Sequence, residues 1–465
     1  MHIDELHIQN FRCFQEIHFR FPPDNTAILI GVNGSGKTSA LDCIAILLNS
    51  IKEKIINIEY GEEYSILGEG QPGIFEKEVK KIFTLNDIKV NEQSQALPVN
   101  VSVLFSTKNH GSISWSITEN IYYHKTIDNI GKGKQQKEQE LNRYIDKLNE
   151  KINSNLLYSN LPLLVYYRTH RMFLNAELVN EQYTNDLHII NQLNAYQGSF
   201  NPGINNFQDF LIWFKQEEDY ENEIRVRQDN AYRKPNLEVI RKAIKIFLEG
   251  FTDSYFHNLR VVRSKSQGTL KLSRRPAQFF FIITKNNQNL KLEQLSDGEK
   301  MLLMLVTDLA RRFAIANPGL GVNALEGEGI VLIDEIDLHL HPQWQRIVIP
   351  SLTRTFPNCQ FIVTTHSPQV LSNVKRENVF ILEDYQLIEV TPHTYGRDSN
   401  SILYELMGVK ERPNQVQDKI NACFALIDED KIEDAKIKLQ ELAELLGEND
   451  PEVVRGQTLI SFLTD

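Results

Sequence analysis

The chain has 465 residues, of which 41% are hydrophobic and 24% are charged, a composition that excludes disordered and collagen-like proteins. Because 61 acidic residues outweigh 50 basic ones and leave a net charge of −11, contact with nucleic acid would require a local basic patch. The four cysteines are widely spaced without a CxxC pair, and no membrane-spanning run or secretion signal is found, so we expect a cytoplasmic protein without disulfides or zinc.

The first 120 residues predict strands around a glycine-rich loop. Apolar residues alternate through the first 20 positions, as they do in β-strands, and residues 26–30 predict a short apolar strand before the loop. A helix is expected over residues 38–51, directly after the loop. Alternating runs at 99–105 and 112–119 predict two strands of an antiparallel side sheet.

The middle of the chain is predicted to be mainly helical. Residues 132–155 are polar with one narrow apolar stripe, which indicates a short exposed helical arm. A buried strand is expected at 161–167, helices over 204–250, and strands again over 259–292.

The last third of the chain predicts the second half of the core. Strands at 330–333 and 360–364 alternate with helices, and this order favours a parallel sheet. We therefore predict four parts, namely 1–125 as the N-terminal half of an α/β core with its side sheet, 126–258 as a mainly helical insertion with a short arm, 259–412 as the C-terminal half of the core, and 413–465 as an acidic helical tail.

The glycine-rich loop at 31–38, GVNGSGKT, fits the pattern GxxxxGK[ST] between a strand and a helix. Its glycines let backbone N–H groups turn toward a β-phosphate, and the helix N-terminus adds positive potential. Lys37 would bridge the β- and γ-phosphates, and the Thr38 hydroxyl would bind Mg²⁺. The nucleotide-binding residues predicted here are Asn33, Gly34, Ser35, Gly36, Lys37 and Thr38.

Two carboxylates and a histidine follow the two later core strands. Asp334 and Glu335 end the strand at 330–333, and His366 follows the strand at 360–364. Because the carboxyl ends of parallel strands meet at one edge of a sheet, all three are expected beside the phosphate loop. Asp334 would hold Mg²⁺ together with Thr38. Glu335 would polarise the attacking water as general base, and His366 would reach the γ-phosphate as a second catalytic residue.

A third motif, LSDGEK at 295–300, precedes a predicted helix. It places Ser296 at the N-cap and Gly298 where the backbone can approach a phosphate. An ordinary capping motif would have the same pattern, so the residues alone leave both interpretations open.

In this order, the motifs resemble those of ABC-type ATPases of the structural-maintenance-of-chromosomes (SMC), RecF and overcoming-lysogenization group. The resemblance implies that 295–300 is the LSGGQ-like signature with Asp297 in place of glycine, that 336–339 is the D-loop with Asp337 at the nucleotide, and that His366 is the switch histidine. It implies ATP and Mg²⁺ as cofactors, and self-association in which the signature of one subunit caps the nucleotide of another. The implied fold is α/β, an ABC-type P-loop ATPase core with a mixed sheet, flanking helices, an antiparallel side sheet, a helical insertion and a helical C-terminal tail.

The spacing of the motifs and several short segments indicate which branch of the group this chain resembles. More residues separate the glycine-rich loop from the signature motif than in transporter ATPases, yet the residues between them include no long coiled-coil arms. The opening NFRCF at 10–14 resembles the recombination-type branch, which implies a nucleotide contact for Arg12, although Phe11 and Phe14 also fit a core.

Segments 166–171, 338–345 and 394–401 are similar to the PtuA-type ATPases of Septu systems and certain retrons, which accompany HNH nucleases in phage defence. This resemblance implies an ATPase that senses a trigger and regulates a separate nuclease. The alternative is a RecF-like DNA-repair ATPase that binds DNA directly. The sequence contains no HNH-type cluster, and the 99 residues after His366 are too few for an appended TOPRIM nuclease. We therefore expect any nuclease centre to lie in a partner protein and not in this chain.

Two charged segments remain. Six cations without an acid lie between 260 and 275, and they form either a nucleic-acid contact or a solvated hairpin face. They are Arg260, Arg263, Lys265, Lys271, Arg274 and Arg275. Arg168 and Arg171 serve the same surface or contact nucleotide. The tail carries ten acids between Asp428 and Glu452, and its leucine face packs on the chain's own core or docks a partner.

Overall fold

The computed structural model forms two compact units, residues 1–397 and 398–465. The described residues are 1–56, 87, 99–107, 111–119, 139–148, 150, 160–169, 192–200, 206–251, 256–263, 279–388 and 392–464.

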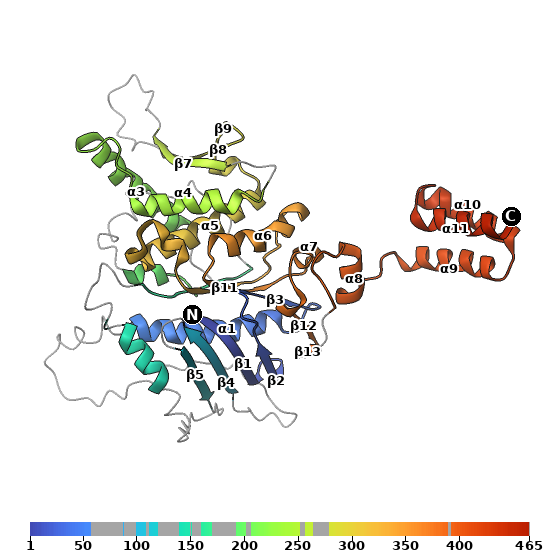
Figure 1. Ribbon diagram of the computed structural model, residues 1–465, viewed down its shortest axis with the longest axis horizontal. Helices are drawn as coiled ribbons and strands as arrows, with labels where there is room; N and C mark the ends of the chain where they lie inside the picture. The colour runs from blue at the N-terminus through green and yellow to red at the C-terminus, as the bar shows by residue number, and fades with distance from the viewer. Residues whose placement is uncertain are drawn as a thin grey trace, which may run out of the picture. The chain divides into compact units, whose positions relative to one another are not determined.

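A six-stranded mixed sheet forms the centre of the first unit (Figure 1). Its strands are β3 (Thr26–Ile30), β6 (Leu163–Tyr167), β10 (Gly329–Ile333), β11 (Cys359–Thr364), β12 (Val379–Glu383) and β13 (Gln386–Ile388). Their order is β13-β12-β3-β11-β10-β6, and all neighbours are parallel except the antiparallel pair β12–β13. The register sets Phe361 opposite Thr26 and Val363 opposite Ile333, so β3, β10 and β11 end at the same edge of the sheet.

Strands β3, β6, β10 and β11 are buried along their whole length, because layers cover both faces of the sheet. In Figure 1, α1 (Lys37–Ile56) lies on one side of this sheet, and α4 (Pro235–Leu248), α5 (Asp297–Ala316) and α6 (Pro342–Thr355) lie on the other. The nearly continuous apolar composition of the strands follows from this double cover.

The antiparallel side sheet has the order β2-β1-β4-β5. Its strands are β1 (His2–Phe11), β2 (Phe14–Arg20), β4 (Val99–Thr107) and β5 (Gly111–Glu119). Alternate residues are buried in β4, as the period of two predicts, and in β1 and β2 this alternation is interrupted, in β1 at the register shift between Ile3 and Glu5. Gln360 of β11 ties this sheet to the central one, because its Oε1 accepts from Ile3 N at 2.8 Å and its Nε2 donates to Ile3 O at 3.0 Å.

The remaining elements of the first unit surround these sheets. A three-stranded antiparallel sheet has the order β7-β8-β9. The elements are β7 (Phe256–Arg263), β8 (Phe279–Lys285), β9 (Gln288–Lys291), α3 (Asn206–Arg227), α7 (Pro368–Leu371) and the 3₁₀ turns Gln192–Tyr196, Leu292–Gln294, Pro318–Glu326 and Arg376–Asn378.

A buried polar network joins the central sheet to α5. The Tyr167 hydroxyl donates to Asp308 Oδ2 at 2.7 Å, and Arg312 Nε donates to the same oxygen at 2.8 Å. Arg311 donates to Asp308 Oδ1 at 2.8 Å. Since buried charges are tolerated only when they are paired, this network holds α5 in one position against β6.

The second unit consists of helices. They are α8 (Ser399–Met407), α9 (Asn414–Asp428), α10 (Ile432–Leu446) and α11 (Pro451–Thr464). The last three share an apolar core that includes Ile420, Cys423, Leu439 and Val453. The leucine face of the acidic tail is therefore buried within the unit itself, apart from Leu445, which is exposed.

The predicted fold class is confirmed: the described residues contain the mixed sheet, the flanking helices, the antiparallel side sheet and the helical C-terminal region. Residues 139–148 are helical, with the apolar stripe of Leu141, Tyr144, Ile145 and Leu148 buried and the positions between them exposed. Most of the rest of 132–155 lies outside the described residues, so the short helical arm stays a prediction. The four-part division stays a prediction. No helix among the described ranges has the length and apolarity to cross a membrane.

Candidate functional site

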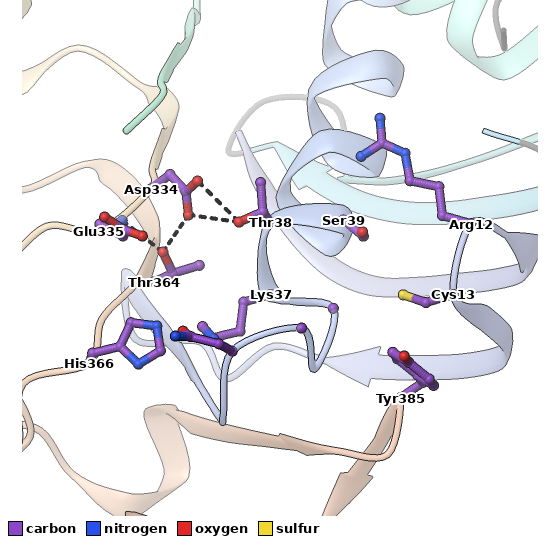
Figure 2. A pocket seen from close by; sticks show the side chains of 13 residues that line it. Arg12, Cys13, Lys37, Thr38, Ser39, Asp334, Glu335, Thr364, His366 and Tyr385 are labelled. Atoms are coloured by element: carbon purple, nitrogen blue, oxygen red, sulfur yellow. Dashed lines mark hydrogen bonds between the residues drawn. The ribbon is translucent and has the colours of Figure 1, made fainter. Parts of the chain in front are cut away.

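A cavity of about 280 Å³ opens at the sheet edge where β3, β10 and β11 end. Figure 2 shows the acids and the histidine on one side of the phosphate loop and Cys13 and Tyr385 on the other. The cavity brings together most of the predicted site residues, namely Arg12, Asn33, Gly34, Gly36, Lys37, Thr38, Asp334, Glu335 and His366. Cys13, Ser39, Thr364 and Tyr385 also line it.

The phosphate loop is shaped by close backbone approach. A Cβ at Gly31 would overlap the carbonyl oxygen of Leu382, and one at Gly36 would lie 2.7 Å from the Phe14 ring. The Lys37 ammonium donates to the carbonyls of Gly31 and Val32, both at 3.0 Å, which holds it at the loop. Burial lowers the pKa of Lys37, and the nearby carboxylates of Asp334 and Glu335 oppose that shift.

Asp334 is only 4% exposed and is held by three hydroxyl groups. Thr364 Oγ1 donates to Oδ1 at 2.6 Å, Thr169 Oγ1 donates to Oδ2 at 2.9 Å, and Thr38 Oγ1 lies 3.1 Å from Oδ2. Donors on both oxygens fix the orientation of the carboxylate, with Thr38 beside it.

Thr38 and Asp334 fit a Mg²⁺ ion. Both offer oxygen ligands at the phosphate loop, and Mg²⁺ in nucleotide sites typically uses one or two protein oxygens together with water and substrate phosphates. Among the described residues there is no group of three or more His, Cys, Asp or Glu that could hold a metal.

Glu335 lies at a strained backbone position. Its φ of 51° is in the left-handed region, which non-glycine residues adopt at a cost and which often occurs at functional sites. The Thr364 hydroxyl accepts from Glu335 N at 2.7 Å while it donates to Asp334. Thr364 therefore positions both acids, and the Glu335 side chain lines the cavity.

His366 lines the cavity from the loop that follows β11. Burial and the positive charge of Lys37 lower its pKa, and the nearby acids oppose the shift. Asp337 Oδ1 accepts from Thr365 Oγ1 at 2.6 Å and from His366 N at 3.4 Å. Asp337 thus supports the histidine loop of its own chain and does not line the cavity.

The predicted signature does not line the cavity either. Ser296 is exposed at the start of α5, where Glu299 Oε2 accepts its N–H at 2.9 Å, and Lys285 forms an ion pair with Glu299. Gly298 is buried, and a Cβ there would lie 2.6 Å from His339 O, so the glycine allows the predicted signature to pack against the predicted D-loop. Neither Ser296 nor Gly298 lines the cavity of its own chain.

Two predicted loop contacts differ from the expected arrangement. Arg12 lines the cavity, but its guanidinium donates to Asp42 Oδ2 at 2.6 Å and to Asp87 Oδ1 at 2.9 Å. The arginine thus ties the N-terminal sheet to α1. Ser35 is buried and its hydroxyl has no partner among the described residues, and it does not line the cavity.

Several residues that support the site are not predicted from the sequence. Thr364 is the last residue of β11, and Thr169 follows the end of β6 by two positions. A hydroxyl residue at the carboxyl end of a core strand is the signal that could have found both. Arg168 pairs with Asp42 at 2.9 Å, so it holds β6 to the phosphate-loop helix. Tyr385 occupies the turn after β12, and nothing in its local pattern indicates a site.

The basic patch is described only in part. Arg260 donates to Asn258 O at 3.0 Å, and Arg263 pairs with Asp219 at 2.7 Å. Lys265, Lys271, Arg274 and Arg275, together with Arg171, lie outside the described residues. A nucleic-acid contact at this patch stays a prediction.

Comparison with known proteins gives consistent matches. Residues 1–371 match the AAA ATPase domain family. The probable ATPase of retron Vc95 from Vibrio cholerae serotype O1 biovar El Tor is 30% identical, and the match covers 88% of this chain and 79% of that protein. The probable ATPase of retron Ec83 from Escherichia coli is 29% identical over 89% of this chain and 77% of its own length. The Septu protein PtuA from Bacillus thuringiensis is 34% identical over 29% of this chain and 36% of its own length.

Proposed function

Since the chain belongs to the AAA ATPase domain family and is an ATPase, we propose that it is the nucleotide-dependent regulator of a separate nuclease in bacterial defence against phages. Two relatives that match most of the chain carry the names of retron ATPases, and a third is a Septu protein. These names favour a defence role over the RecF-like alternative.

The observation that carries the nucleotide mechanism is the meeting of three strand ends in one cavity. Strand β3 leads into Lys37 and Thr38, β10 ends at Asp334 and Glu335, and β11 leads to His366. Positive charge for phosphates, oxygen ligands for a cation and a base for water therefore lie within one site.

In the proposed mechanism, the loop amides and Lys37 bind the phosphates. Thr38 and Asp334 hold Mg²⁺, which neutralises phosphate charge when it is bound. Glu335 orients the attacking water and takes its proton, and His366 contacts the γ-phosphate. Thr364 and Thr169 keep the Asp334 carboxylate in place throughout.

The exposed position of Ser296 supports self-association. A signature that lies away from its own cavity is available to cap the nucleotide of a second copy. ATP binding would then bring two chains together, and hydrolysis would release them, which provides a signal that a partner nuclease can receive.

The test separates phosphate binding from hydrolysis. Lys37→Ala should weaken ATP binding at least about 100-fold, because it removes the cation of the loop. Glu335→Gln should keep binding, lower hydrolysis on the order of 100- to 10,000-fold, and accumulate an ATP-bound dimer. Radiolabelled ATP binding, phosphate release and light scattering measure these three effects. Lys375→Ala and Glu377→Gln are matched controls, since both residues are exposed and lie outside the cavity.

The same variants test the control of a nuclease. Each is assayed on plasmid, single-stranded DNA and tRNA, first alone and then with the protein encoded by the neighbouring gene. We expect no cleavage by the chain alone, and different cleavage by the complex in its Lys37→Ala and Glu335→Gln forms. Equal cleavage by all forms of the complex would contradict the regulatory role. Equal loss of ATP binding in both variants would contradict the assigned residue roles.

A further inference from the structure

The cavity has two chemically different ends. Lys37 marks the phosphate position, and Asp334, Glu335 and His366 lie on one side of it, where the γ-phosphate must react (Figure 2). On the opposite side the cavity is lined by Arg12, Cys13, Ser39 and Tyr385. A nucleotide that places its γ-phosphate at the acids therefore extends its base toward that opposite end.

The aromatic ring of Tyr385 is not explained by packing in a hydrophobic core. Tyr385 occupies the two-residue turn of the β12–β13 hairpin, in which Glu383 pairs with Gln386. Both turn residues have left-handed backbone, with φ of 47° at Asp384 and 64° at Tyr385, a geometry for which asparagine and glycine are strongly preferred. The Tyr385 side chain is 46% exposed, so its burial contributes little to compensate for this cost.

The hairpin is tied to the phosphate loop. Strand β12 pairs in parallel with β3, the strand that enters the loop, and Ile381 lies opposite Ile30. The Leu382 carbonyl fills the space that a Cβ of Gly31 would need. The main chain that carries Tyr385 is therefore fixed relative to the phosphate loop, as a base-binding surface requires.

We propose that Tyr385 is the platform on which the base of the bound nucleotide stacks. The inference rests on the proposed nucleotide site and adds how its base is recognised. Aromatic stacking is worth about 1–3 kcal/mol per base and tolerates any base, because every base has a π-face.

Recognition of the base is expected to be broad. Of the lining residues at this end, Arg12 already donates to Asp42 and Asp87, and Cys13 offers only a weakly hydrogen-bonding thiol. The hydroxyls of Ser39 and Tyr385 also line this end, but a hydroxyl can both donate and accept, so it fits the polar edge of adenine as well as that of guanine. The site should thus accept purine nucleoside triphosphates as a class, with ATP and GTP affinities within about fivefold of each other.

The experiment compares nucleotides with inorganic tripolyphosphate, which has the phosphates but no base. Binding of ATP, GTP and tripolyphosphate in Mg²⁺ is measured by calorimetry with the full chain and with Tyr385→Ala, Tyr385→Phe and Tyr395→Ala. Tyr395 is a matched control, because it is 68% exposed and lies outside the cavity. Tyr385→Ala should weaken ATP and GTP binding about 5- to 150-fold and leave tripolyphosphate binding unchanged. Tyr385→Phe should keep all three affinities within about twofold, since stacking needs the ring and not the hydroxyl.

Two results would overturn the proposal. One is ATP binding by Tyr385→Ala as tight as by Tyr395→Ala. The other is an equal loss of tripolyphosphate binding, which would mean that Tyr385 supports the loop and not the base. Tight ATP binding with GTP binding more than about 100-fold weaker would overturn the broad recognition. Failure of the unsubstituted chain to bind either ATP or tripolyphosphate would instead contradict the proposed function.

Discussion

Two acidic segments of this chain, Asp334-Glu335 in the first unit and Asp428-Glu429-Asp430 in the second, are similar in composition and opposite in surroundings. Asp334 is 4% exposed and accepts hydrogen bonds from hydroxyl groups on both oxygens. Asp428, Glu429 and Asp430 are all exposed, and Glu429 pairs with the neighbouring Lys431 at 2.7 Å.

The difference shows what makes a carboxylate useful for catalysis. Asp334 is held in place by threonines from three segments that are far apart in the chain, so it is oriented before a ligand arrives. The exposed acids are solvated, and Lys431 lowers the pKa of Glu429 through an ordinary surface ion pair. Preorganisation, and not the number of acids, distinguishes the two segments.

The largest expected effect tests this difference directly. Asp334→Asn should lower the rate of ATP hydrolysis at least about 100-fold and raise the Mg²⁺ concentration needed for half-maximal rate, because it removes an anionic ligand. The triple change Asp428→Asn, Glu429→Gln and Asp430→Asn should alter both quantities less than about twofold. Phosphate release measured over a Mg²⁺ titration provides both numbers. A comparable loss in the triple variant would mean that the tail acids take part in catalysis.

A smaller effect concerns the separate cores of the two units. Leu439 is 6% exposed in the core of the helical unit, so Leu439→Ala should destabilise that unit by about 2–5 kcal/mol. Hydrolysis of ATP should stay unchanged, since the catalytic groups lie in the first unit. Ile437→Ala, at a 60% exposed position of the same helix, should change stability by less than about 0.5 kcal/mol. Calorimetric unfolding combined with phosphate release measures both, and a parallel loss of hydrolysis would show that the helical unit supports the site.

A further effect concerns Glu218, a buried acid that forms no ion pair within the part of the chain that the structure describes. Glu218 of α3 accepts a hydrogen bond from Val261 N at 2.7 Å, and burial raises its pKa to about 7. This hydrogen bond and the charge of Arg241 oppose the rise in pKa, whereas the negative charges of Asp219 and Glu221 add to it. The folded state therefore holds a proton that the unfolded state loses near the usual pKa of 4.5, so this group's contribution to stability falls as pH rises from about 4.5 to 7.

Glu218→Gln removes this dependence while keeping an oxygen that accepts from Val261. The variant should match the wild type in stability near pH 4.5 and exceed it by about 3 kcal/mol at pH 8. Glu223→Gln, at an exposed position of the same helix, is the control. Urea unfolding at the two pH values measures the difference, and a constant offset between the two proteins would contradict the assignment.

Much of the site was predictable from local pattern. The loop of residues 31–38, the acids after an apolar strand and His366 after the next strand are each encoded within about ten neighbouring residues. Strand-then-loop order also predicts that they share one edge of a parallel sheet, because parallel strands all end on the same side. The fold class followed from the same periodicities.

The tertiary structure decided which side chains surround these residues. Thr169 donates a hydrogen bond to Asp334, which is 165 positions further along the chain. Arg12, which precedes Asp42 in the sequence, and Arg168, which follows it, both form ion pairs with Asp42. Tyr385 reaches the cavity only because β12 pairs with β3. Burial and hydrogen-bond partners depend on contacts between distant segments, whereas a sequence pattern reports only period and neighbours along the chain. The pattern could therefore place the residues predicted to be catalytic at one sheet edge, but not the residues that orient them.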